Sequence, residues 1–247
     1  MRIVAVQTRP VPGDVEANLE GHLRAIARAA SDGAGLVVFP ELSLTGYEPT
    51  LAAELAMTPD DERLDRLQRA SDEHGIAVAA GLPLVGPDGV HIGTALFRPG
   101  ADPLTFCKHH LHPDEEPFFV PGEGLRVHEL GGTRLAFAIC YEISVPEHAA
   151  RAATDGASVY LASVAKTAAG VAGAIDTLAR VAQHHRMTVL MANCVGACDG
   201  SVCAGRSSAW TAAGGLRAQL AADEEALLVV DTSTGTASSV PLEALGP

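Results

Sequence analysis

Short apolar runs that alternate with longer helical patterns are the feature that most limits how this chain can fold. Residues 36–39 form a continuous apolar run closed by Pro40, which is typical of a strand buried on both faces. Residues 14–31 carry apolar side chains at helical spacing and end before a glycine-containing turn, so we predict an amphipathic helix there. Because a strand buried on both faces needs a layer on each side, the pattern predicts an α/β fold with layered, mixed sheets.

The same alternation continues along the chain. We expect helices at 14–31, 60–74, 146–155 and 171–185, and strands at 2–8, 36–39, 76–81, 91–97, 104–107, 134–139, 158–162 and 188–192. Strands alone are expected at 203–210, 216–220 and 226–231. No repeat, low-complexity tract or linker divides the sequence, and we therefore expect one domain over residues 1–247.

The charge of the chain argues against two classes of partner. Its 17 Lys+Arg against 30 Asp+Glu give a net charge of −13, and only 4% of residues are aromatic. Nucleic acids and anionic membranes both require a basic surface, so neither is an expected partner. No apolar run reaches the ~18 residues of a membrane span, and the N-terminus does not resemble a signal peptide. With five cysteines in no disulfide framework, these features predict a cytoplasmic protein.

Three reactive residue types stand where predicted strands end. Glu41 follows the run 36–39, Lys108 follows the strand at 104–107, and Cys140 follows the strand at 134–139 and precedes a helix that Pro146 opens. Strand ends are where α/β folds place their sites, and a nucleophile between strand and helix exposes its side chain beside free backbone N–H groups. Each residue also has an ordinary explanation: a solvated acid, a solvated lysine and a buried thiol.

Metal binding is not predicted. His109, His110 and His112 alternate along an extended segment and cannot all face one ion. Cys194, Cys198 and Cys203 follow a C-x3-C-x4-C spacing without a convincing fourth ligand, so packing is favoured over a zinc or redox site. We expect no metal and no cofactor.

Three motifs in a fixed order resemble one known family. They are Phe39-Pro40-Glu41-Leu42-Ser43-Leu44-Thr45-Gly46-Tyr47, then Lys108-His109-His110-Leu111, then Ile139-Cys140-Tyr141-Glu142 with Pro146-Glu147. In this order they resemble the nitrilase superfamily of carbon–nitrogen hydrolases over nearly the whole chain. The resemblance implies a four-layer α-β-β-α sandwich with two mixed β-sheets, assembled as a homodimer or a higher homo-oligomer. It also implies a Glu–Lys–Cys catalytic set made of Glu41, Lys108 and Cys140.

The resemblance further implies a second glutamate before the stretch Phe119-Val120-Pro121-Gly122. Spacing favours Glu115, with Glu116 as the adjacent alternative. A free thiol needs a base or a cation beside it at neutral pH. We expect Glu41 to be that base, with His148 as a competitor, and expect the Lys108 ammonium and the Tyr141 backbone N–H to form an oxyanion hole. The expected pocket walls are Tyr47, Ser163 and Val164.

The expected reaction is hydrolysis of a small amide to a carboxylic acid plus ammonia or an amine, through a cysteine thioester. N-carbamoyl amines and nitriles are alternative substrates of the same residues. A substrate bearing an acid would need a cation in the pocket, for which Lys166 and Arg206 are candidates, although both are equally explained as solvated charges. Two other classes stay open: a catalytically idle scaffold with the same fold, and a thiol redox or zinc protein.

Overall fold

The computed structural model describes residues 1–242 of the chain, and within them the strands form two large sheets. The first has seven strands in the order β15-β14-β1-β2-β3-β4-β5, and the second has six in the order β13-β12-β9-β8-β7-β6, counted over residues 1–242. Each sheet has a parallel centre, β1-β2-β3 or β7-β8-β9, flanked by antiparallel strands. Both sheets are therefore mixed, as expected.

The strands of the first sheet are β1 (Arg2–Gln7), β2 (Leu36–Val38), β3 (Ala77–Gly86), β4 (Gly89–Arg98), β5 (Ala101–Cys107), β14 (Ala226–Asp231) and β15 (Thr236–Pro241). Those of the second are β6 (Val127–Leu130), β7 (Thr133–Ile139), β8 (Val159–Val164), β9 (Thr188–Asn193), β12 (Ser208–Trp210) and β13 (Leu216–Gln219). A separate two-stranded ribbon pairs β10 (Val195–Cys198) with β11 (Ser201–Ala204).

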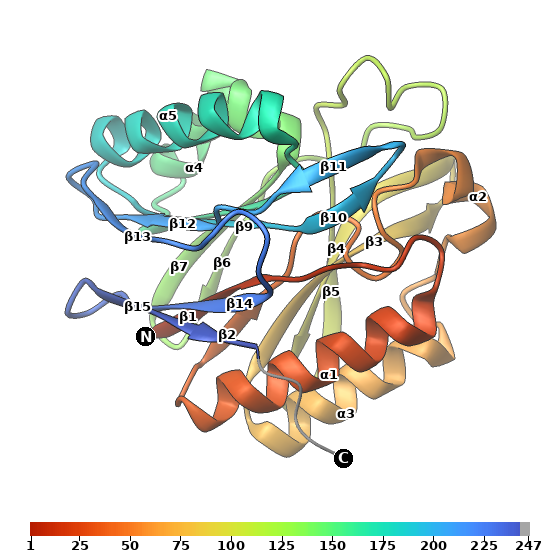
Figure 1. Ribbon diagram of the computed structural model, residues 1–247, viewed down its shortest axis with the longest axis horizontal. Coiled ribbons are helices and arrows are strands. Elements are labelled where there is room, and N and C mark those ends of the chain that lie inside the picture. The colour runs from red at the N-terminus through yellow and green to blue at the C-terminus, as the bar shows by residue number, and fades with distance from the viewer. Residues whose placement is uncertain (243–247) are drawn as a thin grey trace.

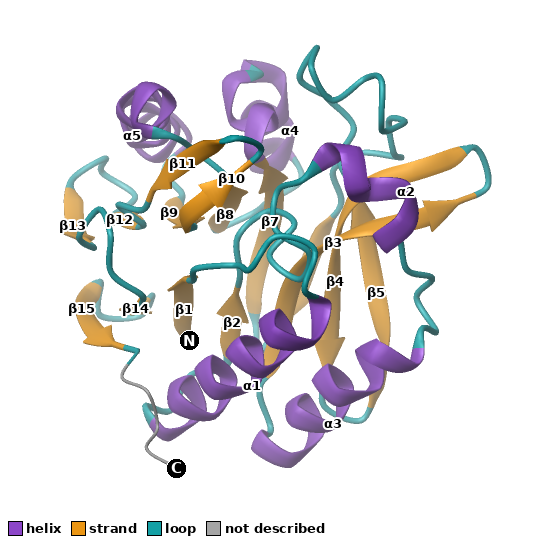
Figure 2. Ribbon diagram, turned by 45° about the vertical axis from the view of Figure 1, so that its right-hand side comes forward, coloured by secondary structure: helices purple, strands orange, loops and turns teal. Residues whose placement is uncertain are grey.

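Helices cover the outer face of each sheet. The helices α1 (Val15–Ser31) and α3 (Asp65–His74) lie on the first sheet, and α4 (Pro146–Thr154) and α5 (Ala168–His185) lie on the second (Figure 1). Figure 2 shows the two sheets between these helical layers. The expected four-layer α-β-β-α sandwich is thereby confirmed. None of the helices within residues 1–242 has the length and apolar character needed to cross a membrane.

The layering follows from strands that are apolar on both faces. Successive residues of a strand point to opposite sides. In β1, Val4 and Val6 pack into the core beneath α1 and α3, whereas Ile3 and Ala5 pack between the two sheets. The central strands of the second sheet divide in the same way between the inter-sheet core and the core under α4 and α5. An uninterrupted apolar run thus fills two cores at once.

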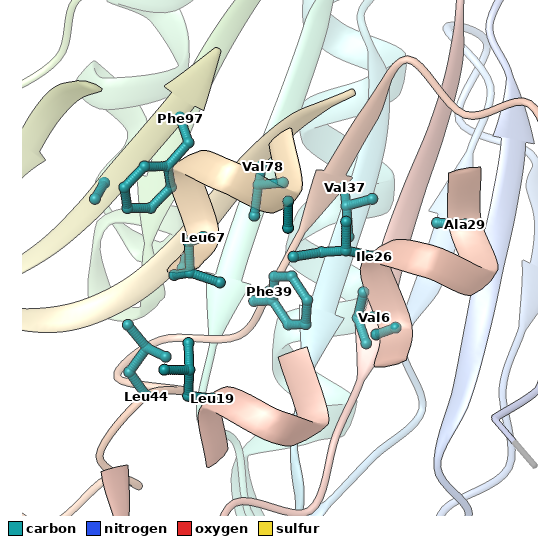
Figure 3. Close-up of a cluster of buried hydrophobic side chains, with 14 of the residues drawn as sticks. Val6, Leu19, Ile26, Ala29, Val37, Phe39, Leu44, Leu67, Val78 and Phe97 are labelled. Atoms are coloured by element: carbon teal, nitrogen blue, oxygen red, sulfur yellow. The ribbon is translucent and has the colours of Figure 1, made fainter. Parts of the chain in front are cut away.

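The core beneath α1 and α3 leads directly to the turn that carries Glu41. Figure 3 shows Phe39, the first residue after β2, packed among side chains that include Val37 and Ile26. Phe39 is fully buried, and the ring of His22 stacks on it with centroids 3.9 Å apart. Burying a phenylalanine side chain contributes roughly 1.5–3 kcal/mol, so the chain is firmly anchored two residues before Glu41.

The structure corrects several predicted elements. The single strand predicted at 203–210 is wrong: β11 and β12 belong to different sheets, because Gly205 and Arg206 both adopt positive φ and turn the chain. The helix predicted at 60–74 is α-helical only in α3, after a 3₁₀ turn at Glu62–Leu64. The strands β6, β10 and β15 and the short helix α2 (Ala52–Leu55), preceded by a 3₁₀ turn at Pro49–Leu51, were not predicted.

Candidate active site

Glu41 lies in a tight turn after β2, with its side chain buried. The turn is fixed against β3 because the Leu44 N–H donates to the Gly81 carbonyl at 3.0 Å. Glu41 Oε1 accepts a hydrogen bond from Lys108 Nζ at 2.7 Å. The other oxygen, Oε2, is buried and has no hydrogen-bond partner among residues 1–242. Burial raises the pKa of this carboxyl group above its usual 4.5, and the Lys108 charge opposes only part of that rise.

Close packing between β3 and the turn predicts a stability effect. A Cβ atom at Gly81 would lie 2.4 Å from the Pro40 carbonyl oxygen and 2.6 Å from the Leu42 nitrogen. We therefore expect Gly81→Ala to lower the free energy of unfolding by about 1–3 kcal/mol, since the Glu41 turn must shift. Denaturant unfolding checks this. The control Gly173→Ala, which meets open space within α5, should be neutral or stabilising by up to about 1 kcal/mol; equal behaviour of the two variants would contradict the argument.

Lys108 is a fully buried cation held between two carboxylates. It directly follows β5, where its N–H donates to the Ile92 carbonyl at 2.8 Å. Its Nζ donates to Glu41 Oε1 and to Glu115 Oε1, both at 2.7 Å. Although burial opposes the charge, the adjacent carboxylates Glu41 and Glu115, together with Cys140, raise the pKa of Lys108 above its usual 10.5. The ammonium has three donors, of which these carboxylates use two, so one remains for another acceptor.

Glu115 is buried and well supplied with donors. Besides Lys108, its carboxylate accepts hydrogen bonds from the Tyr47 hydroxyl at 2.9 Å and from the His112 backbone N–H at 2.7 Å. Burial, followed by the charges of Glu41 and Glu115, raises the pKa of Tyr47, which therefore stays a neutral donor. The structure brings Glu115 to Lys108 and leaves Glu116 exposed at the surface.

Cys140 occupies a sharp turn between β7 and the 3₁₀ helix at Cys140–Ser144. Its φ of 44° is in the left-handed region that non-glycine residues rarely adopt. Such strain concentrates at functional positions, and here it turns the side chain out of the strand direction. Burial and then the charge of Glu41 raise the pKa of the thiol to about 11, while Lys108 and Lys166 lower it. The resting thiol is therefore protonated at neutral pH.

Glu142 ties the cysteine turn to the segment after Lys108. It is buried, and its Oε2 accepts from the Ile139 N–H at 2.9 Å while its Oε1 accepts from the His109 N–H at 2.8 Å. One carboxylate thus binds the backbone on both sides, next to Cys140 and next to Lys108. The sequence gives no indication of this positioning role beyond an acid two residues after the cysteine.

A cavity of about 400 Å³ opens in front of the cysteine. Tyr47, Glu115, Cys140 and Tyr141 line it, together with Lys166 and neighbouring residues. The Tyr141 N–H lies in the first turn of the 3₁₀ helix, where backbone donors have no intrahelical acceptor. The cysteine, the acid Glu115, the cation Lys166 and the backbone donor of Tyr141 therefore lie on residues that line one opening.

Two predicted pocket residues lie behind the cavity wall. Ser163 Oγ donates to the Phe39 carbonyl at 2.8 Å, and Val164 packs fully buried against the core under α4 and α5. The lining instead comes from the residues after them, Ala165, Lys166 and Thr167. The reason is strand length, because β8 continues to Val164 rather than ending at the predicted residue 162.

Two other predicted candidates were His148 as the base and the three neighbouring cysteines as a metal or redox site. His148 hydrogen-bonds the Tyr160 hydroxyl at 2.8 Å, and burial lowers its pKa. Cys194, Cys198 and Cys203 pack together as free thiols on the β10-β11 ribbon, and Cys198 also lines the cavity. Over residues 1–242, no group of three or more His, Cys, Asp or Glu side chains is arranged to hold a metal ion.

The chain is similar in sequence to known hydrolases. The sequence model of the family described as carbon–nitrogen hydrolase matches residues 2–241. An (R)-stereoselective amidase from a Pseudomonas species is 33% identical over 212 residues, which cover 85% of this chain and 77% of the relative.

Solved structures of an amidase from Nesterenkonia sp. AN1 are also similar. One, a mutant showing Michael addition of acrylamide at its active-site cysteine, superposes with a TM-score of 0.84 at 32% identity and covers 94% of this chain and 92% of its own. Another is a cysteine-to-alanine mutant of the same amidase in complex with butyramide. It has a TM-score of 0.84 at 31% identity, and the match covers 98% of this chain and 91% of the mutant's chain.

Proposed function

The chain belongs to the carbon–nitrogen hydrolase family and is an amidase-like hydrolase, and from this premise we propose that it cleaves a small amide through a thioester on Cys140. The products are a carboxylic acid and ammonia or an amine. The observation that carries the proposal is the buried Glu41–Lys108–Glu115 cluster beside a strained cysteine at one cavity. One mutant of the Nesterenkonia amidase is in complex with butyramide and another shows Michael addition of acrylamide at its cysteine, which supports small amides as the substrate class.

Glu41 is proposed as the general base. The Cys140 thiol has a pKa of about 11, so it needs a proton acceptor before it can attack a carbonyl carbon. Glu41 Oε2 is buried without a partner among residues 1–242, while Oε1 is occupied by Lys108. The raised pKa of Glu41 brings it closer to working pH, where a base is most effective. The same group then passes its proton to the leaving nitrogen and later activates water against the thioester.

Lys108 and the Tyr141 backbone N–H are proposed as the oxyanion hole. The third donor of the buried ammonium and the free donor of the 3₁₀ turn both suit an oxygen that gains negative charge. Glu115 keeps Lys108 charged and oriented, and Tyr47 in turn holds Glu115. In this arrangement Glu115 and Tyr47 act as positioning residues.

The proposal is tested with a panel of small amides, N-carbamoyl amines and nitriles, scored for ammonia release. We expect turnover of small amides and none in the Cys140→Ala control. Turnover confined to carbamoyl amines or nitriles would replace the proposed substrate class with that alternative. Absence of a covalent acyl adduct on the Cys140 peptide during turnover would contradict the thioester.

The idle-scaffold alternative is tested by cysteine labelling. An activated thiol at an open cavity predicts rapid iodoacetamide modification of Cys140, read by mass spectrometry against Cys107, Cys194, Cys198 and Cys203. The pKa of Cys140 is raised as well, so its expected reactivity depends on Glu41 as the proposed base. Burial raises the pKa of Cys107 and hydrogen bonding to Cys203 raises that of Cys198; neither thiol is assigned a base, so both should react slowly. Uniform slow labelling of all five would favour the scaffold. The single-domain organisation, homo-oligomer and cytoplasmic location remain predictions.

A further inference from the structure

Lys166 is a second cation beside the Cys140 sulfur that the mechanism above does not use. Its half-buried side chain lines the same cavity as Cys140, and its charge is one of those that lower the pKa of the thiol. Ala165, the preceding residue, also lines this cavity. Two consecutive residues after β8 therefore share this cavity with the cysteine.

The backbone of Lys166 is held in place by its neighbours. Its N–H donates to Asn193 Oδ1 at 2.8 Å, and its carbonyl accepts from Asn193 Nδ2 at 3.1 Å and from the Ala204 N–H at 2.9 Å. Thr167 forms an isolated bridge with Cys203 of the ribbon. Within residues 1–242, the lysine salt bridges to carboxylates are those of Lys108. The Lys166 backbone is thus held in place, and no carboxylate in the described structure forms a salt bridge with its ammonium.

The net charge of the groups near Cys140 favours a second cation beside the thiol. Glu41 and Glu115 carry two negative charges and Lys108 one positive charge, so this cluster alone is net negative. A sulfur anion formed beside a net negative cluster is disfavoured. Adding Lys166 makes the four groups neutral before the thiol ionises.

The use of lysine in this chain is also unusual. The chain contains two lysines, Lys108 and Lys166, whereas its other fifteen Lys+Arg residues are all arginine. Both lysines are among the charges that act on Cys140. A compact ammonium is a point charge that can approach a single sulfur atom, whereas a planar guanidinium is suited to paired oxygens.

We propose that Lys166 is a further catalytic residue, whose ammonium stabilises the Cys140 thiolate while the thiol proton moves to Glu41. In this step the S–H bond breaks, an O–H bond forms on Glu41 Oε2, and the electron pair stays on the sulfur that Lys166 faces. The inference rests on the proposed function, because it assumes that Cys140 is the nucleophile. The remaining titratable groups on the cavity wall are Tyr47, His112, Asp114, Glu115, Tyr141, Cys198 and Asp199.

The test is the pH dependence of iodoacetamide alkylation at Cys140, read by peptide mass spectrometry in the full chain. In Lys166→Met we expect the apparent pKa of Cys140 to rise by about one unit, which lowers the alkylation rate at neutral pH about tenfold. Lys166→Arg, which keeps the charge, should stay closer to the wild type. Arg206→Met removes a cation from an exposed position outside the cavity lining and should leave the profile unchanged. Lys166→Gln serves as a second neutral variant if the Met variant does not fold.

The outcomes separate this inference from the proposed function. If Cys140 of the wild type is not labelled selectively, the proposed function fails. If the wild type is labelled selectively and the neutral Lys166 variants share its pH profile, only the role of Lys166 is overturned. An unchanged profile with a raised KM for amides that carry a carboxylate would also overturn it, and would assign Lys166 to substrate binding instead.

Discussion

Replacing Glu41 with glutamine is expected to lower kcat/KM for a small amide by at least about a thousandfold, or about 4 kcal/mol of transition-state stabilisation. The glutamine carbonyl can still accept the bond from Lys108 Nζ. The amide NH₂ that replaces Oε2 cannot take a proton from Cys140, from the leaving group or from water. The loss should fall on kcat, because the cavity keeps its shape.

The free energy of unfolding of Glu41→Gln should rise or stay unchanged, although its activity falls. The pKa of Glu41 is raised by burial, so its ionised form is disfavoured in the folded protein and costs stability at neutral pH. Lys108 retains Glu115 as its partner. Thermal unfolding and far-UV circular dichroism check the fold, and Glu116→Gln, an exposed neighbour of the second glutamate, is the matched control with unchanged turnover. Activity of the Glu41 variant within tenfold of the wild type would refute the base assignment.

The raised pKa of Glu41 also fixes where activity is lost in acid. A general base must be ionised, so wild-type kcat/KM should fall as the pH drops through the folded-state pKa of Glu41, which lies above the usual 4.5. Any residual activity of Glu41→Gln should lack this acid limb. A wild-type acid limb at or below the usual carboxyl value would contradict the assignment.

Lys108→Met is expected to lose both activity and stability. Removing an oxyanion donor costs about 10²–10³-fold in kcat. The variant also leaves two buried carboxylates, Glu41 and Glu115, without their shared cation, and breaking a buried pair in this way costs about 3–5 kcal/mol. For a chain of this size that loss corresponds to a fall in Tm of roughly 6–20 °C.

A variant that also removes the two carboxylates distinguishes unpaired buried charges from poor packing of methionine as the cause of the lost stability. The triple variant Lys108→Met, Glu41→Gln, Glu115→Gln removes all three charges and should regain most of the stability but none of the activity. The single variant should become more stable as the pH falls, because Glu41, whose folded-state pKa is already raised, binds its proton more tightly in the folded state than in the unfolded state. A triple variant as unstable as the single one would show that the buried charges are not the cause.

The layers of the fold and the ends of the strands were predictable from the sequence, because both depend on residues that are close together in the chain. Uninterrupted apolar runs along strands such as β1 and β7, buried on both faces, indicated the layers, and the strand ends pointed to Glu41, Lys108 and Cys140. The break at Gly205 and Arg206 was missed, because the apolar run continues across it and only the positive φ values reveal the turn.

What the sequence by itself determined is therefore the sandwich, the positions of the three reactive residues and the family. The tertiary structure alone decided that Glu115 rather than Glu116 bonds Lys108, that Ala165–Thr167 rather than Ser163 and Val164 line the cavity, and that Lys166 lines it together with Cys140. The physical reason is how far apart in the sequence the interacting residues lie. Strand composition and strand ends are set by neighbouring residues, whereas the ion pair of Lys108 with Glu41, 67 residues away in the sequence, exists only once folding buries charges that must then find partners.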